Sequence, residues 1–418
     1  MEQTAKVNRR WAIFGVGCSV FVLSMFFRVS TTVISPELTK DLNLTYTQLG
    51  LLSSVFFYAF ASCQVPLGLA LDRFGSRTVV TILNGLGVFG VLLFASAQTA
   101  AQCVWARVLM GIGMSCNLMG VLTLIAAWFP VNQFAFLNGL VGSIGVLGSL
   151  FAATPLALLT HTFGWRKSFL LFAVINALLA LCFFLIVRNR PPVQQDSKPT
   201  PVNPIKGLGE VLSLPVFWVI SVSTFFRYGC VMALLGLWAG PYLMNGLGAD
   251  ILSTGNALLL MNVGMMIGLP ISGRISDQVI RSRKKVIIPS IWIMALLILF
   301  LVFLPRGISM VWIYVWFLSF GLASSAGQIM YSHIKELVPS QVMATAMTGI
   351  NLFTMLGAAF IMQAMGLVVE AGPQGLSHPE AFRPAWYLCL GGLGLSGIIY
   401  MLIPDSQVLK KQPVSGSN

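Results

Sequence analysis

Charged side chains are scarce in this chain. Asp, Glu, Lys and Arg make up 9% of its 418 residues, whereas about a quarter of an ordinary soluble domain is charged. Apolar residues reach 57%, or about 238 side chains. Twelve membrane-spanning helices of about 20 apolar residues each would need about 240. This composition excludes a soluble enzyme and a disordered chain.

Groups that carry acid–base, redox or metal chemistry are equally few. The chain has 12 acidic residues and 3 histidines, and its 7 cysteines show no CxxC spacing and no nearby histidine cluster. Metal centres need convergent His, Cys or carboxylate ligands, and disulfide frameworks need paired cysteines. We therefore expect no metal site, no cofactor and no enzymatic activity.

What the sequence does contain is a series of long uncharged apolar runs. Each run is long enough to cross a bilayer as a helix. The twelve runs are 11–36, 47–71, 78–98, 103–129, 134–160, 167–187, 214–244, 251–275, 286–304, 309–333, 341–369 and 385–403. The sequence thus predicts an all-α membrane protein with 12 transmembrane helices.

The basic residues indicate how these helices are oriented. Lys and Arg outnumber Asp and Glu by 25 to 12. With a cytoplasmic N terminus, 17 basic residues lie in cytoplasmic segments, 5 in external segments and 3 within spans. Cytoplasmic loops are enriched in Lys and Arg, so both termini are predicted to be cytoplasmic. The short loops favour a prokaryotic inner membrane. Topology and anionic lipid account for the positive charge, and no nucleic acid is expected as a partner.

A polar, proline-rich segment divides the twelve spans into six and six. It follows directly after the sixth span and contains four prolines between residues 191 and 201. Such a composition is typical of a linker. The sequence therefore predicts an N-terminal bundle over 1–190, a cytoplasmic linker over 191–212 and a C-terminal bundle over 213–418.

The two halves share local motifs. The tripeptide Phe-Phe-Arg occurs at Phe26–Arg28 in the first span and at Phe225–Arg227 in the seventh. The stretch Gly68–Arg77 resembles the signature of the loop between helices 2 and 3 in the major facilitator superfamily, and Arg107–Gly113 is similar to its helix 4 pattern of Arg, Gly and Gly. The resemblance covers the whole six-plus-six plan. It implies the MFS fold, with two pseudo-symmetric six-helix bundles that alternate access to a central site.

The resemblance also implies where the gates lie. In this family the loop between helices 2 and 3 makes ion pairs and helix-terminus contacts at the cytoplasmic side. Residues carried over to this role, including a weaker counterpart in the second half, are Gly68, Asp72, Arg73, Gly75, Arg77, Arg274 and Asp277.

Three basic residues enter the spans: Arg28, Arg107 and Arg227. An ionisable residue at membrane depth is costly, and its presence points to function. All 12 acidic residues fall in loops, tails or span ends, so none is placed to neutralise Arg28 or Arg227. Two facing guanidinium groups are costly unless an anion lies between them, and guanidinium binds carboxylate, phosphate or sulfonate through two parallel hydrogen bonds. These residues therefore predict a site for a small organic anion.

A paired arginine on helices 1 and 7 resembles the organophosphate:phosphate antiporters, and a single helix 1 arginine resembles the anion:cation symporters. In those symporters an acidic residue precedes the arginine, whereas Phe27 stands here. Symport through another group, or anion exchange, remains open, and His333 is the one titratable candidate near the core. Arg107 either binds substrate or extends its side chain to the headgroups. The alternative function is proton-coupled efflux of a drug or sugar.

Neutral polar side chains within spans could complete the site or could hydrogen-bond between helices. They are Tyr58, Asn117, Tyr228, Asn256, Asn262, Gln328, Asn351 and Gln363. We expect a monomer whose partners are a small anionic substrate, a possible proton or counter-anion, and the lipid bilayer.

Overall fold

The computed structural model describes residues 2–189, 209–304, 307–339, 342–372 and 379–405. Over these residues the fold is helical, without β-sheet. The first half comprises α1 (Glu2–Val29), α2 (Thr31–Leu42), α3 (Tyr46–Ser62), α4 (Gln64–Ser96), α5 (Ala100–Met114), α6 (Asn117–Trp128), α7 (Val131–Phe151) and α8 (Thr154–Ile186). The second half comprises α10 (Pro215–Ala233), η1 (Leu234–Trp238), α11 (Ala239–Pro241), η2 (Tyr242–Gly246), α12 (Ile251–Arg274), η3 (Ile275–Val279), α13 (Lys284–Val302), α14 (Met310–Ser324), η4 (Ser325–Gly327), α15 (Gln328–Leu337), α16 (Met343–Glu370), η5 (Pro379–Phe382) and α17 (Arg383–Tyr400).

The predicted all-α membrane fold is confirmed. Among the described residues, nine stretches are long and apolar enough to cross a membrane, and one of them, Leu137–Ile186, contains two of the predicted spans. Two other predicted spans correspond to α3, with 17 residues, and α17, with 18. Each of the twelve predicted spans is therefore helical where the structure describes it.

Glycine turns separate consecutive spans inside two long helices. The backbone leaves the helical conformation at Gly75 in α4, with φ 74°, and at Gly164 in α8, with φ 77°. Glycine reaches this left-handed region without the steric cost that a Cβ would add. Both turns lie in gaps that the sequence predicted between spans, and Gly75 belongs to the loop with the family signature.

The seventh and tenth spans are not continuous α-helices. The seventh passes from α10 into two π-helical segments, η1 and η2, on either side of α11. The tenth is broken between α14 and α15 by the 3₁₀ turn η4. Such departures from α-helical bonding are frequent at functional sites. The break at η4 borders the side chain of Arg227, one of the three predicted arginines.

The chain forms two compact units that do not follow its two halves. Unit 1 comprises Met1–Thr200, Met232–Leu259 and Ala359–Phe382, and unit 2 comprises Pro201–Val231, Leu260–Ala358 and Arg383–Asn418. The predicted linker lies largely outside the described residues. The domain boundaries at 190 and 213 therefore stay a prediction.

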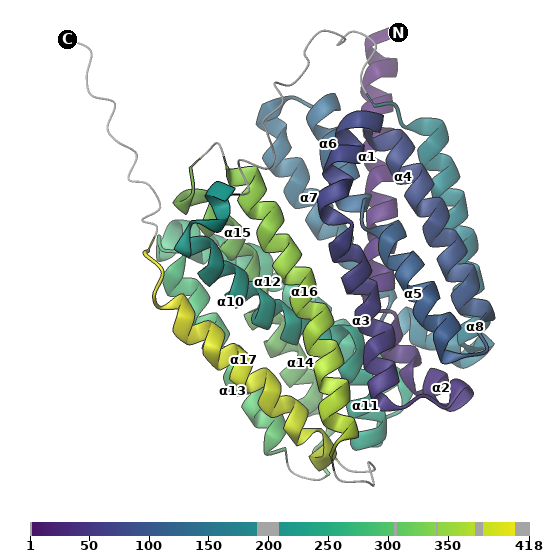
Figure 1. Ribbon diagram of the computed structural model, residues 1–418, viewed down its shortest axis with the longest axis vertical. Coiled ribbons are helices and arrows are strands. Elements are labelled where there is room, and N and C mark those ends of the chain that lie inside the picture. The colour runs from purple at the N-terminus through teal and green to yellow at the C-terminus, as the bar shows by residue number, and fades with distance from the viewer. Residues whose placement is uncertain (1, 190–208, 305–306, 340–341, 373–378, 406–418) are drawn as a thin grey trace. The chain divides into compact units, whose positions relative to one another are not determined.

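Unit 1 is built around α4, which packs against α5 and α8, while α1 packs against α7 (Figure 1). Segments of the second half join it through hydrogen bonds to α2. The hydroxyl of Thr31 donates to the carbonyl of Gly236 at 2.9 Å, and that of Thr32 donates to Leu235 at 2.6 Å. Both carbonyls belong to η1, so the π-helical segment is fixed by polar side chains of α2.

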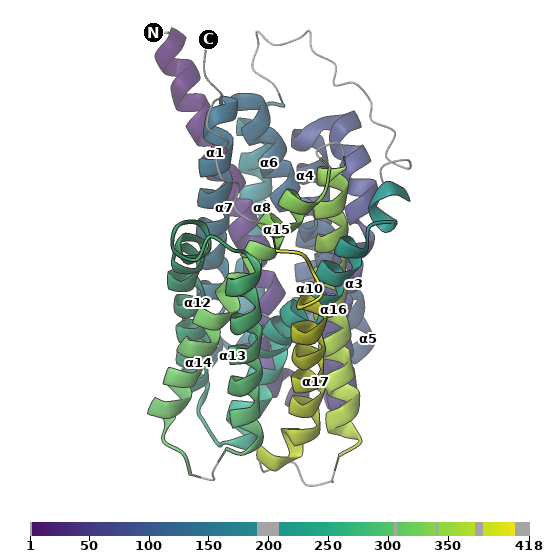
Figure 2. The same cartoon turned by 90° about the vertical axis from the view of Figure 1, so that its left-hand side faces the viewer.

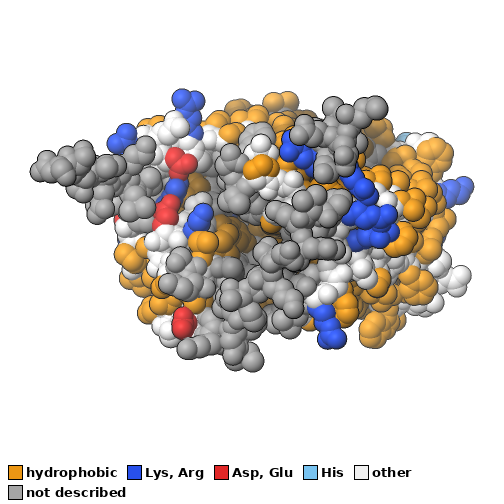
Figure 3. Space-filling view, turned by 90° about the horizontal axis from the view of Figure 1, so that it is seen from above, with side chains coloured by type: hydrophobic (Ala, Val, Ile, Leu, Met, Phe, Trp, Pro, Cys, Tyr) orange, Lys and Arg blue, Asp and Glu red, His pale blue; other side chains and the backbone are white. Residues whose placement is uncertain are grey.

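In unit 2, α13 lies between α14 and α17 (Figure 2). Its outer side chains are apolar and exposed, as on other helices: Leu296 is 63% and Phe303 is 68% exposed, and Trp105 of unit 1 is 65% exposed. Exposed apolar side chains on this scale fit contact with lipid. Figure 3 looks onto the end where α1 begins, and Lys and Arg side chains are spread over this face.

Candidate functional site

Arg28 lies in the last turn of α1, one residue before that helix ends at Val29. It is 6% exposed, and its guanidinium carbon stands 4.5 Å from the centre of the Phe60 ring. No hydrogen bond or ion pair joins its side chain to any described residue, and its Nε is buried without a partner. A buried cation held only against an aromatic face keeps its hydrogen-bond donors available for an anion.

Arg107 projects from α5 and is fully buried. Its Nη1 donates to the backbone carbonyl of Phe27 at 2.8 Å, and its guanidinium lies 4.6 Å from the Phe56 ring centre. Nε and Nη2 have no partner among the described residues. The side chain therefore does not extend to the headgroups. It holds the carbonyl of the residue before Arg28, which makes it a positioning group for that arginine.

Arg227 lies in α10 and is 4% exposed. Its Nη2 donates to the carbonyl of Ser324, at the point where α14 gives way to η4. A Cβ built on Gly327 would overlap the same guanidinium. The absence of a side chain at Gly327 thus creates the space that Arg227 occupies beside the broken tenth span.

The ion pairs among the described residues lie elsewhere. The three ion pairs in this part of the chain are Arg166 with Asp41, Arg283 with Asp277 and Arg283 with Glu336. None involves Arg28, Arg107 or Arg227. The prediction that no acidic residue neutralises these cations agrees with this geometry, and among the described residues no cluster of His, Cys, Asp and Glu could hold a metal ion.

The neutral polar candidates divide into two groups. In unit 1, Asn117 is buried and accepts from Asn84 at 2.7 Å while donating to the Val20 carbonyl at 3.0 Å, which is an interhelical contact. Asn256 accepts from Thr154 at 2.8 Å, near the ends of their helices. Tyr58 donates to Gln363 at 3.1 Å. Tyr58 and Phe60 share α3, so this tyrosine lies on the helix that covers Arg28, whereas Gln363 lies on α16.

In unit 2, Tyr331 donates to Asn351 at 3.4 Å. Tyr228 follows Arg227 directly in α10 and is half-buried. Gln328 begins α15 and is exposed, whereas Asn262 is buried in α12. In sequence, Tyr228 adjoins Arg227 and Gln328 adjoins Gly327, the residue that borders the Arg227 guanidinium.

The loop with the family signature is tied to α8. The backbone N–H of Arg77 donates to the Asn189 side chain at 2.8 Å, and its Nε donates to the Phe184 carbonyl at 2.8 Å. Arg73 lies over its neighbour Phe74, and the side chain of Asp72 is outside the described part of the structure. A Cβ on Gly75 would strike Asn189, so this glycine permits both the turn and the contact.

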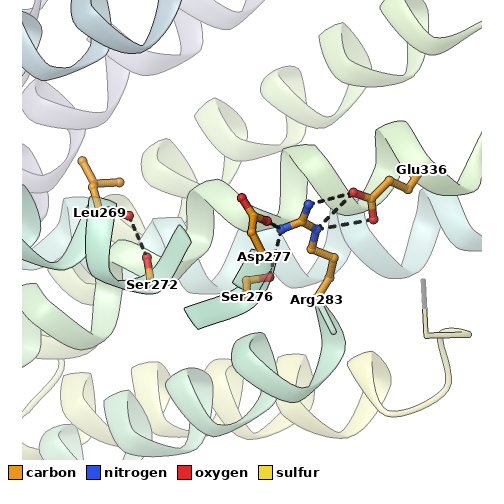
Figure 4. A network of polar contacts seen from close by, with 6 residues as sticks. All are labelled: Leu269, Ser272, Ser276, Asp277, Arg283 and Glu336. Carbon is orange, nitrogen blue, oxygen red and sulfur yellow. Dashed lines mark hydrogen bonds and ion pairs between the residues drawn. The ribbon is translucent and has the colours of Figure 1, made fainter. Parts of the chain in front are cut away.

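The second-half counterpart uses a residue that the sequence did not identify. Arg283 bonds to both Asp277 and Glu336, with Nη2 at 2.9 Å from Glu336, and it also donates to Ser276 (Figure 4). Burial alone would lower the pKa of Arg283, but the carboxylates of Glu336 and Asp277 raise it overall. Arg274 donates instead to Gln278. The ionic partner of Asp277 is thus Arg283, six residues later in the chain.

Comparisons with known proteins identify the family. A model described as Major Facilitator Superfamily matches residues 16–362 and 230–416. The chain belongs to the Major Facilitator Superfamily. Sequence relatives include the uncharacterized transporter YybO of Bacillus subtilis (25% identical, covering 59% of this chain and 60% of the relative) and the hexuronate transporter of the same organism (26%, 66% and 69%). A probable L-galactonate transporter of Escherichia coli is 24% identical over 88% of this chain and 83% of its own.

The superfamily fold is supported by solved structures as well. The crystal structure of a D-xylose-proton symporter matches with a TM-score of 0.76 at 16% identity, covering 94% of this chain and 98% of that one. At this identity the match shows the fold alone. The chain spans 60% of the length of YybO, so its own activity is argued from its residues. The family is one of membrane transporters, and the family match agrees with the expectation that the chain is not an enzyme.

Proposed function

We propose that this protein is a secondary active transporter of a small organic anion, with Arg28 and Arg227 as the groups that bind the acid. The observation that carries the proposal is the state of Arg28. It is a buried guanidinium whose donors meet no described acceptor, while the ion pairs among the described residues lie elsewhere. An unpaired buried cation is strongly unfavourable, and an anion that binds it removes that cost.

The relatives support the same chemical class. Their names refer to a hexuronate and to L-galactonate, both of which are carboxylates with several hydroxyl groups. A guanidinium binds such a carboxylate through two parallel bonds. Tyr58 and Gln363 in unit 1 offer neutral donors and acceptors, which suit the hydroxyl groups of a sugar acid.

Transport itself is proposed to follow rocker-switch alternating access, as symport with a cation or as exchange for a counter-anion. We propose a monomer in the inner membrane with both termini in the cytoplasm. The prevalence of Lys and Arg over Asp and Glu in the loops predicted to be cytoplasmic supports this orientation.

The direct test is counterflow in proteoliposomes with D-glucuronate, L-galactonate, a sulfonate and an organophosphate, with D-xylose as the uncharged control. We expect transport of at least one anion and none of xylose. Arg28→Ala and Arg227→Ala should each reduce counterflow at least a hundredfold, the effect of losing a bidentate charge-assisted contact worth about 3 kcal/mol or more.

The matched control is Arg9→Ala, because Arg9 lies on the same helix as Arg28 but is exposed. It should leave counterflow unchanged. Undiminished anion counterflow in both Arg28→Ala and Arg227→Ala would rule out the proposed site, and xylose transport without anion transport would favour the sugar-efflux alternative.

A further inference from the structure

A histidine and a tyrosine in unit 2 form a buried pair with an incomplete set of hydrogen bonds. His333 of α15 and Tyr400 of α17 are both fully buried, and Nδ1 of the histidine lies 2.7 Å from the tyrosine hydroxyl. Nε2 of His333 is also buried, but it has no hydrogen-bond partner among the described residues. Buried polar atoms are normally satisfied, so this nitrogen needs an explanation.

The open nitrogen can take up one proton without disturbing the pair. In neutral histidine one ring nitrogen donates and the other accepts, whereas in the cation both donate. If the Tyr400 hydroxyl donates to Nδ1, Nε2 carries the hydrogen. If Nδ1 carries the hydrogen and donates to Tyr400, the lone pair of Nε2 is free. A proton from water then binds this lone pair, forming one N–H bond and breaking none within the pair.

Burial is the largest influence on His333 and disfavours its charged form, whereas two neighbouring carboxylates favour it. Glu336 on its own helix and Asp405 in the segment after α17 attract a positive charge, and the Pro404 carbonyl lies near the ring although outside hydrogen-bonding geometry. Arg283, preceding α13, opposes it. That arginine is itself paired with Glu336 and with Asp277 of η3, which reduces its repulsion.

The remaining charged neighbours are held in place by other contacts. Lys284 of α13 donates to the carbonyls of Met401 and Ile403. Asp405 accepts from Ser282 at 2.7 Å and 2.9 Å, and Lys335 beside the histidine is exposed. These contacts fix the charged neighbours of the pair, and the imidazole of His333 is the group that can gain a proton.

Arg227 of α10, a residue of the proposed anion site, lies within electrostatic range of Tyr400. Its guanidinium is bonded to Ser324, nine residues before His333 on the same broken span. When His333 is neutral, Tyr400 can donate to it and turn its oxygen lone pairs toward other groups. When His333 is charged, Tyr400 must accept from it, and a second positive charge lies near Arg227.

We propose that His333 and Tyr400 form the proton-binding site of this transporter and that Tyr400 links it to Arg227, so that proton and anion move in the same direction. The inference rests on the proposed anion transport and names its coupling ion. A positive charge at His333 favours an anion at Arg227, and by linkage the anion favours the proton to the same extent. The carboxylate that precedes the helix 1 arginine in anion:cation symporters is replaced here by Phe27, and this pair would take over its role.

The test uses full-length protein in proteoliposomes with whichever of the four anions the wild type exchanges in counterflow. An inward proton gradient should drive its accumulation and acidify the lumen. His333→Asn keeps an amide in place of Nδ1 and cannot be protonated. We expect it to lose gradient-driven accumulation at least tenfold and to make the remaining counterflow independent of pH, and the exposed His161→Asn to behave as wild type.

Three outcomes separate the possibilities. Accumulation by His333→Asn at the wild-type level overturns the inference. A wild type that exchanges anion but does not respond to the proton gradient also overturns it, while leaving the proposed function intact. A wild type that exchanges none of the four anions contradicts the proposed function itself.

A second measurement does not depend on the folding of His333→Asn. The chain has three histidines, so selective ¹⁵N-histidine labelling gives three ring signals, and His161→Asn and His378→Asn assign the third by elimination. Saturating anion should raise the pH at which the His333 signal changes by about one to two units, which corresponds to a coupling of about 10- to 100-fold. An unchanged titration would contradict the coupling, and Tyr400→Phe should abolish the rise.

Discussion

Two buried arginines, each the last residue of a Phe-Phe-Arg tripeptide, have different surroundings. Arg28 in unit 1 lies against the face of Phe60 and bonds to no described polar group, whereas Arg227 in unit 2 donates to the Ser324 carbonyl and fits the space above Gly327. The sequence repeat therefore specifies the residue type at each position but not its partner.

The difference indicates separate roles in the same proposed site. A guanidinium with unused donors gains the most from a bound carboxylate, because burial has already removed its hydration and the free-energy cost does not arise again on binding. A guanidinium bonded to a helix break must exchange or share that bond when an anion arrives. We infer that Arg28 contributes mainly affinity, and that Arg227 transmits binding to the tenth span.

Apart from removal of the two arginines themselves, the largest effect is expected where the space occupied by the Arg227 side chain is filled. In Gly327→Ala the new methyl group overlaps the guanidinium, which must leave the Ser324 carbonyl. A hydrogen bond from a charged group is worth about 1.5–3 kcal/mol, so KM for the transported anion should rise about tenfold to a hundredfold. Uptake kinetics in proteoliposomes measure it.

Gly394→Ala is the matched control for Gly327→Ala. A Cβ at Gly394 meets nothing within 4 Å, and the residue lies inside α17. Alanine is favoured over glycine in a helix by about 0.5–1 kcal/mol, so this variant should be as stable as the wild type or slightly more stable, with normal KM. An unchanged KM in Gly327→Ala would show that Arg227 does not depend on this space.

A smaller effect should follow from removing the group that supports Arg28. Arg107→Met deletes the bond to the Phe27 carbonyl but also deletes a buried charge. Because an apolar side chain can replace a buried cation at little cost, we expect the melting temperature to stay within a few degrees and KM to rise about tenfold. A large loss of stability with unchanged KM would assign Arg107 to folding alone. The exposed Trp105→Leu on the same helix is the control.

Much of this arrangement could be predicted from residue types and spacing. The order of residue types along the chain is enough to predict the twelve apolar runs, the three arginines within them and the lack of acidic partners. The burial of Arg107 did not follow, because it depends on contacts of α5 with Phe27 and Phe56, which lie on other helices.

Contacts between distant segments could not be predicted in this way. The bond between Arg227 and Ser324 joins residues 97 apart, and no periodicity relates them. Arg274 and Asp277 were carried over together as gate residues, but the chain turns after η3 and brings Arg283 to Asp277. His333 was recognised as titratable, but its pairing with Tyr400 depends on how α15 packs in unit 2.

The smallest effect is expected at a surface arginine, Arg166, which serves as the reference for the two buried arginines. Arg166 pairs with Asp41 at 2.5 Å, and both side chains are about 40% exposed.

The hydrogen bond from Trp165, followed by those from Arg166, lowers the pKa of Asp41. A carboxylate with a lowered folded-state pKa stabilises the protein above its unfolded pKa of about 3.9, and this stabilisation is lost as the pH falls through the folded value. For so exposed a pair it is about 1 kcal/mol or less. Asp41→Asn should therefore lower the melting temperature slightly at pH 7 and by progressively less as the pH falls below about 3.9, with anion counterflow unchanged at neutral pH. A loss of counterflow comparable to that of Arg28→Ala would show that burial does not separate the arginines that transport from those that only stabilise.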